Sequence, residues 1–206
     1  MKHFDMCRTN NRFFRVEPLG FTLLILVSFI LVPAGAVAST PADLPKDADG
    51  WTVFTASSDS RIMYVSGSGS DTTGQVYSPS DPDIGGSPFD PAGTVAAFAT
   101  YSAAVAHARE GYPDWVLFRR GGTFSAQIRP WSGRGATEYA LVGAYGSSGT
   151  MPVINPPSPG SDAFVHTNDP LSHFAVTGLD FYSSTRDPGS SSYTGTDGGR
   201  GFWFYT

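Results

Sequence analysis

Cysteine and charged residues are both scarce in this chain of 206 residues. Cys7 is the single cysteine, so no disulfide can form within the chain. Only 15% of the residues are charged, with 13 Lys and Arg against 18 Asp and Glu, and no basic cluster follows the N-terminal segment. A chain with a net charge of −5 is poorly suited to a polyanion, so we expect no nucleic-acid partner.

Long segments free of helix breakers are also few, because 24 Gly and 16 Pro are spread along the chain. This excludes helix bundles and coiled coils, which need such segments. The content of 40% hydrophobic and 14% aromatic residues is still enough for a packed core. The composition therefore favours a globular protein built from short elements.

One longer apolar run lies near the N-terminus, at residues 21–32, and four basic residues precede it. The run ends at Pro33, and Ala36-Val37-Ala38 supplies the small residues that a signal peptidase accepts. This pattern predicts a signal peptide over residues 1–38, with cleavage before Ser39. An uncleaved anchor is the alternative, although a membrane span needs about 20 apolar residues. Either way we expect the rest of the chain to be secreted, periplasmic or at the cell surface, with no membrane contact after cleavage.

The mature chain divides into three parts by composition. Residues 39–50 are rich in Pro and Asp and are predicted to be a linker. Residues 51–110 are predicted to hold an N-terminal strand at 61–65, a long loop rich in Gly, Ser, Pro and Asp, and one helix. Thr100 is the expected N-cap of this helix. The apolar residues that follow it at helical spacing are Tyr101, Ala104, Val105 and Ala108.

Residues 111–206 contain only short apolar runs, which are typical of strands. The clearest runs recur near positions 116, 141, 175 and 203. This recurrence favours a parallel β-solenoid, whose strands alternate inward apolar with outward polar residues. A β-sandwich also contains closely spaced short strands and is the alternative architecture.

Four stretches carry a family resemblance: RIMYVS at 61–66 with the following Gly69-Ser70-Asp71, GYPDWVLFRRGGTF at 111–124, the segment 133–154, and VTGLDF at 176–181. In this order they resemble the N-terminal coils of secreted right-handed parallel β-helix proteins, the pectate-lyase-like superfamily. The resemblance implies an all-β fold, a right-handed parallel β-helix (solenoid) capped by one N-terminal α-helix, with its first coils at residues 111–206. Because the chain ends within an expected strand, we expect a β-helix that is incomplete at its C-terminus.

The resemblance also implies a function for an exported protein. Members of this superfamily include polysaccharide lyases and glycoside hydrolases, so we expect a monomer that binds or cleaves an extracellular polysaccharide, as a fragment without the catalytic coils. The alternative is a non-catalytic rod, a cell-surface or adhesion module. No residue is assigned as catalytic, because fold does not fix function.

Two sets of residues are candidates for binding. Arg119 and Arg120 could grip a substrate carboxylate, or they could instead bond Asp114, Glu138 or loop carbonyls. Three loop carboxylates are candidate Ca²⁺ ligands: Asp71, Asp81 and Asp83. Loop aspartates also stabilise turns, which is the competing interpretation of all three.

Glycoside hydrolysis would need two carboxyl groups that face one groove. Asp180, Asp187 and Asp197 lie close enough in the sequence to be considered, but their Gly and Ser neighbours are typical of turns.

Overall fold

The structure is a computed structural model, and it describes residues 44–167, 170–195 and 201–205. All of them belong to one compact unit, Ser39–Thr206. The predicted signal peptide and residues 39–43 of the predicted linker lie outside the described residues. Within these ranges the regular structure consists of ten strands and one short helix, which confirms the all-β class. No helix in the described ranges has the length and apolarity required to cross a membrane.

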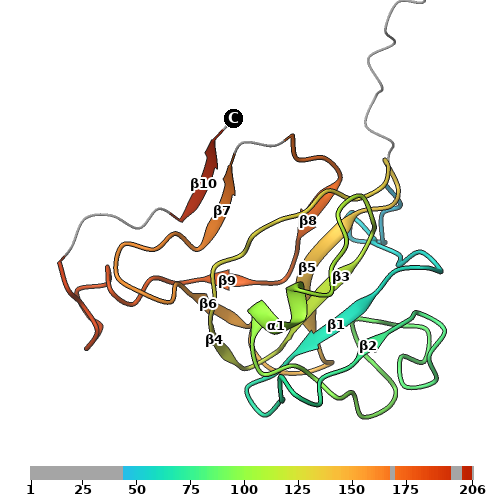
Figure 1. The fold of residues 1–206 in the computed structure, drawn as a ribbon, viewed down its shortest axis with the longest axis horizontal. Coiled ribbons are helices and arrows are strands. Elements are labelled where there is room, and N and C mark those ends of the chain that lie inside the picture. The colour runs from blue at the N-terminus through green and yellow to red at the C-terminus, as the bar shows by residue number, and fades with distance from the viewer. Residues whose placement is uncertain (1–43, 168–169, 196–200, 206) are drawn as a thin grey trace, which may run out of the picture. The chain divides into compact units, whose positions relative to one another are not determined.

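The largest sheet is built mainly from parallel strands. Its members β1 (Ile62–Val65), β3 (Trp115–Arg119), β5 (Ala140–Tyr145) and β8 (Phe174–Val176) pair side by side in that order, each parallel to the next (Figure 1). The two-residue strand β2 (Val76–Tyr77) adds to the outer edge of β1 in the antiparallel sense. We call this five-stranded sheet the central sheet.

Two smaller sheets contain only parallel pairs. One is formed by β4 (Thr123–Ser125), β6 (Val153–Asn155) and β9 (Asp180–Phe181). The other is formed by β7 (Phe164–Thr167) and β10 (Phe202–Tyr205). From β5 onward the chain visits the central sheet, the three-stranded sheet and the two-stranded sheet in turn, and then repeats that order. A β-sandwich depends on antiparallel pairing. Among the ten strands of the described residues, only β1 and β2 pair in the antiparallel sense.

A core of apolar side chains lies between the three sheets. The central sheet contributes Met63, Val116, Phe118 and Val142 to this core, all fully buried. The smaller sheets contribute a further set, which includes Phe124, Ile154 and Phe164. Burial of this apolar surface is the main term that stabilises such short strands.

The opposite face of the central sheet is also apolar, which differs from the predicted alternation. Ile62, Tyr64, Trp115 and Leu117 point away from the core and are buried nonetheless. They are covered by the long loop after β1, which supplies the buried Ile84 among other residues. A sheet that is covered on both faces selects apolar residues at successive positions, and the run Trp115–Phe118 follows from this.

The predicted helix is present but shorter than its apolar stripe. Helix α1 (Tyr101–Val105) begins after Thr100, whose side-chain oxygen accepts a hydrogen bond from the backbone N–H of Ala103. The Tyr101 ring stacks on Phe118, with 5.7 Å between ring centroids. Ala108 still packs against the core, although it lies beyond the helix end. After α1 the chain continues with backbone hydrogen bonds of the 3₁₀ type, which join each N–H to the carbonyl three residues earlier. One of them runs from the Ala108 N–H to the Val105 carbonyl.

The loop that covers the central sheet, residues 66–97, is attached at several points. Directly after the loop, the chain returns beside β1, where the Phe98 N–H donates to the Tyr64 carbonyl. In its middle, the Tyr64 hydroxyl donates to the carbonyl of Pro88 at 2.9 Å. The Phe89 ring lies against Trp115, with centroids 5.1 Å apart. The predicted loop is therefore an integral layer of the fold, and we refer to it as the covering loop.

Candidate functional site

Two adjoining clefts open beside the covering loop, where β3 and β5 end. The first cleft has a volume of about 610 Å³ and the second a volume of about 570 Å³. Asp90, Arg120 and Gly146 line both of them, so the clefts meet at these residues. Their sizes are in the range of small-molecule binding sites.

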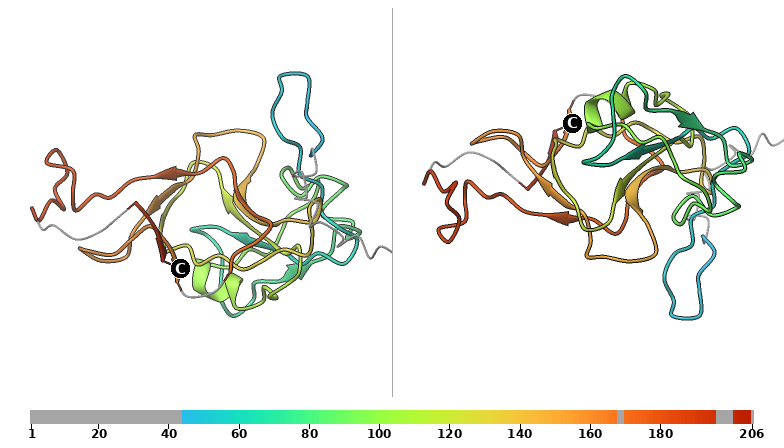
Figure 2. Two further views of the ribbon diagram at one scale, coloured as in Figure 1. Left: turned by 90° about the horizontal axis from the view of Figure 1, so that it is seen from above. Right: turned by 90° about the horizontal axis from the view of Figure 1, so that it is seen from below.

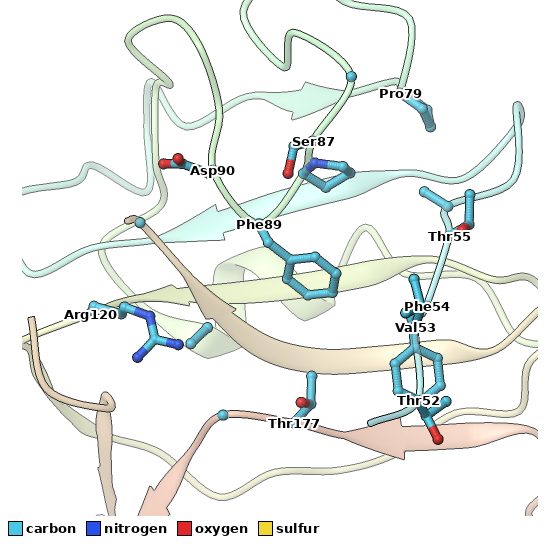
Figure 3. Close-up of a pocket in the computed structure, with 16 residues that line it drawn as sticks. Thr52, Val53, Phe54, Thr55, Pro79, Ser87, Phe89, Asp90, Arg120 and Thr177 are labelled. Atoms are coloured by element: carbon cyan, nitrogen blue, oxygen red, sulfur yellow. The ribbon is translucent and has the colours of Figure 1, made fainter. Parts of the chain in front are cut away.

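The first cleft combines aromatic walls with hydroxyl groups. Phe54 and Phe89 both line it, and Thr55 and Thr177 add hydroxyls (Figure 3). Both rings are held by other aromatic residues: Phe89 packs on Trp115, and Phe54 makes an edge contact with Tyr139 at 5.7 Å between centroids. The walls are therefore fixed before any ligand arrives.

Small residues leave the floor of the first cleft open. Gly178 adopts a φ of 66°, a conformation that favours glycine. A Cβ atom at this position would lie 3.4 Å from the Cβ of Ala144 and 3.9 Å from Nη2 of Arg120. Gly178 therefore allows the turn after β8 and leaves room beside the Arg120 side chain.

The second cleft is more polar than the first. The covering loop and the turn after β5 line it with hydroxyl groups, from Ser66, Ser68, Ser70, Thr73, Thr94, Ser147 and Ser148. Tyr145, at the end of β5, adds a phenol whose pKa is raised by burial. Its hydroxyl therefore stays protonated and can donate a hydrogen bond at neutral pH.

Arg119 and Arg120 both line the second cleft. Arg119 is exposed at the end of β3, and the N–H of Arg120 donates to the Tyr145 carbonyl at 3.0 Å. The carboxylates expected as their structural partners are bonded elsewhere, Asp114 to Arg109 and Glu138 to Arg134. In the described part of the chain, no carboxylate lies within ion-pair distance of Arg119 or Arg120.

Arg109 differs from Arg119 and Arg120, because it forms an ion pair within the protein, with Asp114. Asp114 is fully buried and accepts hydrogen bonds from the Arg61 N–H and from the N–H, Nε and Nη2 of Arg109, at 2.7–2.9 Å. The hydrogen bond to Asp114 raises the pKa of Arg109. This pair joins the segment after α1 to the starts of β1 and β3, and neither member lines the two clefts.

The three Ca²⁺ candidates are not brought together. Asp71 binds the start of α1: its carboxylate accepts the N–H groups of Ala99 and Thr100 and the Thr100 hydroxyl, at 2.8–2.9 Å. The backbone hydrogen bond from Thr100 is the largest cause of its lowered pKa. Asp81 accepts the N–H of Ser78, as a turn residue does. Across the described ranges, no three His, Cys, Asp or Glu side chains form a group that could hold a metal.

Two of the carboxylates considered for hydrolysis, Asp180 and Asp187, line neither cleft. Asp187 accepts the Tyr182 hydroxyl at 2.6 Å and the Gly189 N–H at 2.8 Å, and the Tyr182 bond is the main cause of its lowered pKa. Asp180 lies in β9 and is exposed, and Asp197 lies outside the described residues. Among the described residues that line the clefts, Asp90 is the only acid.

Comparisons with protein-family models, curated proteins and solved structures found no match. The family resemblance therefore depends on the four sequence stretches alone.

Sequence reasoning found Arg119 and Arg120 but missed the first cleft. Its walls come from segments 52–56 and 86–90, which were assigned to the N-terminal strand region and the long loop without any role. Neither segment has a periodic pattern, so the sequence contains no local signal that they meet.

Proposed function

We propose that the described unit is a right-handed parallel β-helix, exported through the signal peptide at residues 1–38. Parallel pairing in all three sheets supports this architecture, as does the repeated visiting order from β5 to β10. The strands β3, β5 and β8 are joined through strands of the other sheets, as coils of a solenoid require.

We further propose that the protein binds an extracellular polysaccharide in the first cleft. The observation that carries this proposal is the pairing of fixed aromatic walls, Phe54 and Phe89, with the hydroxyls of Thr55 and Thr177 (Figure 3). A sugar ring has apolar faces of C–H groups and a rim of hydroxyls, so it matches a site with aromatic sides and polar edges. Rigid walls also lower the ordering cost of binding.

The clefts support binding rather than hydrolysis. Retaining and inverting glycosidases both use two carboxyl groups, about 5 Å or 6.5–9.5 Å apart. Asp90 is the one acidic residue among the described residues of the two clefts, so it has no carboxylate partner there. We therefore assign the clefts to recognition.

The test is a binding measurement with the mature chain that begins at Ser39. Soluble neutral and acidic polysaccharides are titrated and followed by calorimetry or microarray binding. In Phe54→Ala one wall is lost, and we expect affinity to fall about 3- to 10-fold, because an aromatic contact contributes roughly 0.5–1.5 kcal/mol beyond its area. Thr177→Val, which removes a single hydroxyl at nearly constant shape, should weaken binding about fivefold.

Tyr193→Ala is the matched control, since Tyr193 is an exposed aromatic residue that lines neither cleft. Equal losses in the control and in Phe54→Ala would contradict a site in the first cleft. No binding of any polysaccharide by the folded wild-type chain would instead favour the non-catalytic rod.

A further inference from the structure

We propose that a third cleft, separate from the two described above, binds a small zwitterion with an apolar body, an amino acid or a short peptide. Glu110 contacts the ammonium group of this ligand, and Arg129 contacts its carboxylate. The inference goes beyond the proposed function, because none of the residues that line the third cleft lines the first or the second.

The third cleft has a volume of about 490 Å³ and lies beside β7. Three parts of the chain line it: the turn after α1, the segment that follows β4, and β7 together with residues 170–171. The segment after β4 runs parallel to β7, since the Ile128 N–H donates to the Ala163 carbonyl and the Val165 N–H donates to the Ile128 carbonyl. Backbone hydrogen bonds therefore hold two of the walls together.

Glu110 and Arg129 bring opposite charges to the third cleft. Neither of them forms an ion pair within the part of the chain that the structure describes. Both side chains are oriented by neutral groups instead: Glu110 accepts the Ser132 N–H at 3.0 Å, and Nη2 of Arg129 donates to the Gln127 side-chain oxygen at 3.0 Å. A carboxylate and a guanidinium have more hydrogen-bonding sites than these contacts use, so both charges are available to a ligand.

The backbone around both charged residues is also fixed. The Arg129 N–H donates to the Tyr101 hydroxyl at 3.2 Å, and that hydroxyl donates to the Arg129 carbonyl at 3.0 Å. Directly after Glu110, the Gly111 N–H donates to the Ser132 carbonyl at 3.0 Å. Because the two charges are positioned before a ligand arrives, less ordering is required when it binds.

Trp131 is the most deeply buried aromatic residue of the third cleft. It is only 6% exposed, and its ring makes an edge contact with Phe174. Its indole Nε1–H has no hydrogen-bond partner within the described residues. Unpaired buried donors are rare in folded proteins, so this one indicates an acceptor that those residues do not supply. The carboxylate of a zwitterion brings such acceptors to the cleft.

The remaining walls determine the rest of the ligand. Apolar side chains from Pro130, Val165, Pro170 and Leu171 line the third cleft and suit a hydrocarbon body. A simple anion would pair with Arg129 but would be repelled by Glu110, and a simple cation would meet the opposite difficulty. Only a ligand with both an ammonium group and a carboxylate pairs with both residues.

Leucine and its capped forms test this inference. The mature chain that begins at Ser39 is titrated with leucine, with N-acetylleucine, which has no ammonium group, and with leucinamide, which has no carboxylate. Binding is followed by calorimetry and by saturation-transfer NMR. We expect leucine to bind about tenfold more tightly than either capped form, because each capped form loses one charge-assisted hydrogen bond. Dileucine and trileucine are titrated as well, and the tightest binder among the three identifies an amino acid or a short peptide as the ligand.

Two variants assign the contacts, each by the preference that it removes. Glu110→Gln should abolish the preference for leucine over N-acetylleucine and keep the preference over leucinamide. Arg129→Gln should do the reverse. Glutamine at position 110 keeps a side-chain oxygen that can accept the Ser132 N–H, so we expect an unchanged unfolding midpoint. Lys46→Gln is the matched control, because Lys46 is an exposed cation that lines none of the three clefts, and it should keep both preferences.

Three results would overturn the zwitterion site. The first is that neither leucine nor the two peptides bind, and the second is that the wild-type chain binds leucine no better than its capped forms. The third is that Lys46→Gln lowers the two preferences as much as the cleft variants do. Polysaccharide binding in the first cleft is measured separately with the Phe54 and Thr177 variants, so either proposal can fail while the other stands.

Discussion

The early and late strands of this fold pair in the same way but are buried to different degrees. Every residue of β1 and β5 is buried, whereas β8 is half-buried and β10 is largely exposed. Parallel pairing is common to both regions. The difference is the covering loop, which lies over β1, β3 and β5, and the helix α1, which packs on β1 and β3.

This comparison shows that strand pairing alone does not bury a sheet. The outward side chains of Ile62, Tyr64 and Leu117 are buried because residues 66–97 return over them. In β10, Phe204 contacts the ring of the core residue Phe164 and is still 58% exposed. Stability should therefore be concentrated in the covered region.

The largest expected effect comes from the core of the covered region. Phe118→Ala removes a fully buried ring that contacts Tyr101 and Phe124, and we expect a loss of about 3–5 kcal/mol in the free energy of unfolding. Phe204→Ala, the same change in the exposed region, should cost much less. Chemical denaturation of both variants measures the difference, and equal losses would show that the two regions are equally packed.

A substitution that loosens the covering loop should have an intermediate effect on the free energy of unfolding. Gly69 lies close to the backbone of Ala97 and Phe98. A Cβ atom added at Gly69 would clash with the carbonyl oxygens of both residues. Gly69→Ala should therefore push the loop away and cost about 1–3 kcal/mol. Gly67→Ala is the matched control, since a Cβ there meets nothing within 4 Å. The unfolding midpoints of both variants, together with tryptophan fluorescence, to which the buried Trp115 contributes, report whether the loop still covers the sheet.

The smallest expected effect is a pH dependence at the start of α1. The pKa of Asp71 is lowered from 3.8 by hydrogen bonds to Thr100 and Ala99. A lowered pKa means that this carboxylate stabilises the folded state above pH 3.8, and that the contribution is lost as the pH falls through the folded-state pKa.

Asp71→Asn should remove that part of the acid sensitivity. The measurement is the change in unfolding midpoint between pH 5 and about pH 2.5 in the wild type and the variant. The same acid sensitivity in both would mean that the Asp71 contacts contribute nothing to stability.

Much of the local structure could be predicted from the sequence. Thr100 was correctly expected to cap the helix, and the apolar runs at 115–118 and 174–176 coincide with β3 and β8. These features depend on neighbours a few residues away, which the sequence displays directly. The apolar stripe expected for this helix reached Ala108, whereas α1 ends at Val105, because Ala108 packs on the core without being helical.

The candidate site was less predictable. The adjacent pair Arg119 and Arg120 is visible in the sequence, but its lack of carboxylate partners is not, because Asp114 could have bonded either Arg109 or Arg120. Phe54 and Phe89 carry no sequence signal of a shared cleft. Their meeting depends on contacts between segments that are distant along the chain.

The sequence by itself therefore determined the short strands, the helix start and the scarcity of charge, because these follow from local propensity and composition. Only the tertiary structure decided that the covering loop returns to the central sheet (Figure 2). It also decided which arginines are paired and where the clefts open. The physical reason is that such contacts join residues far apart in sequence, and their energy exists only once the chain has returned to the same place.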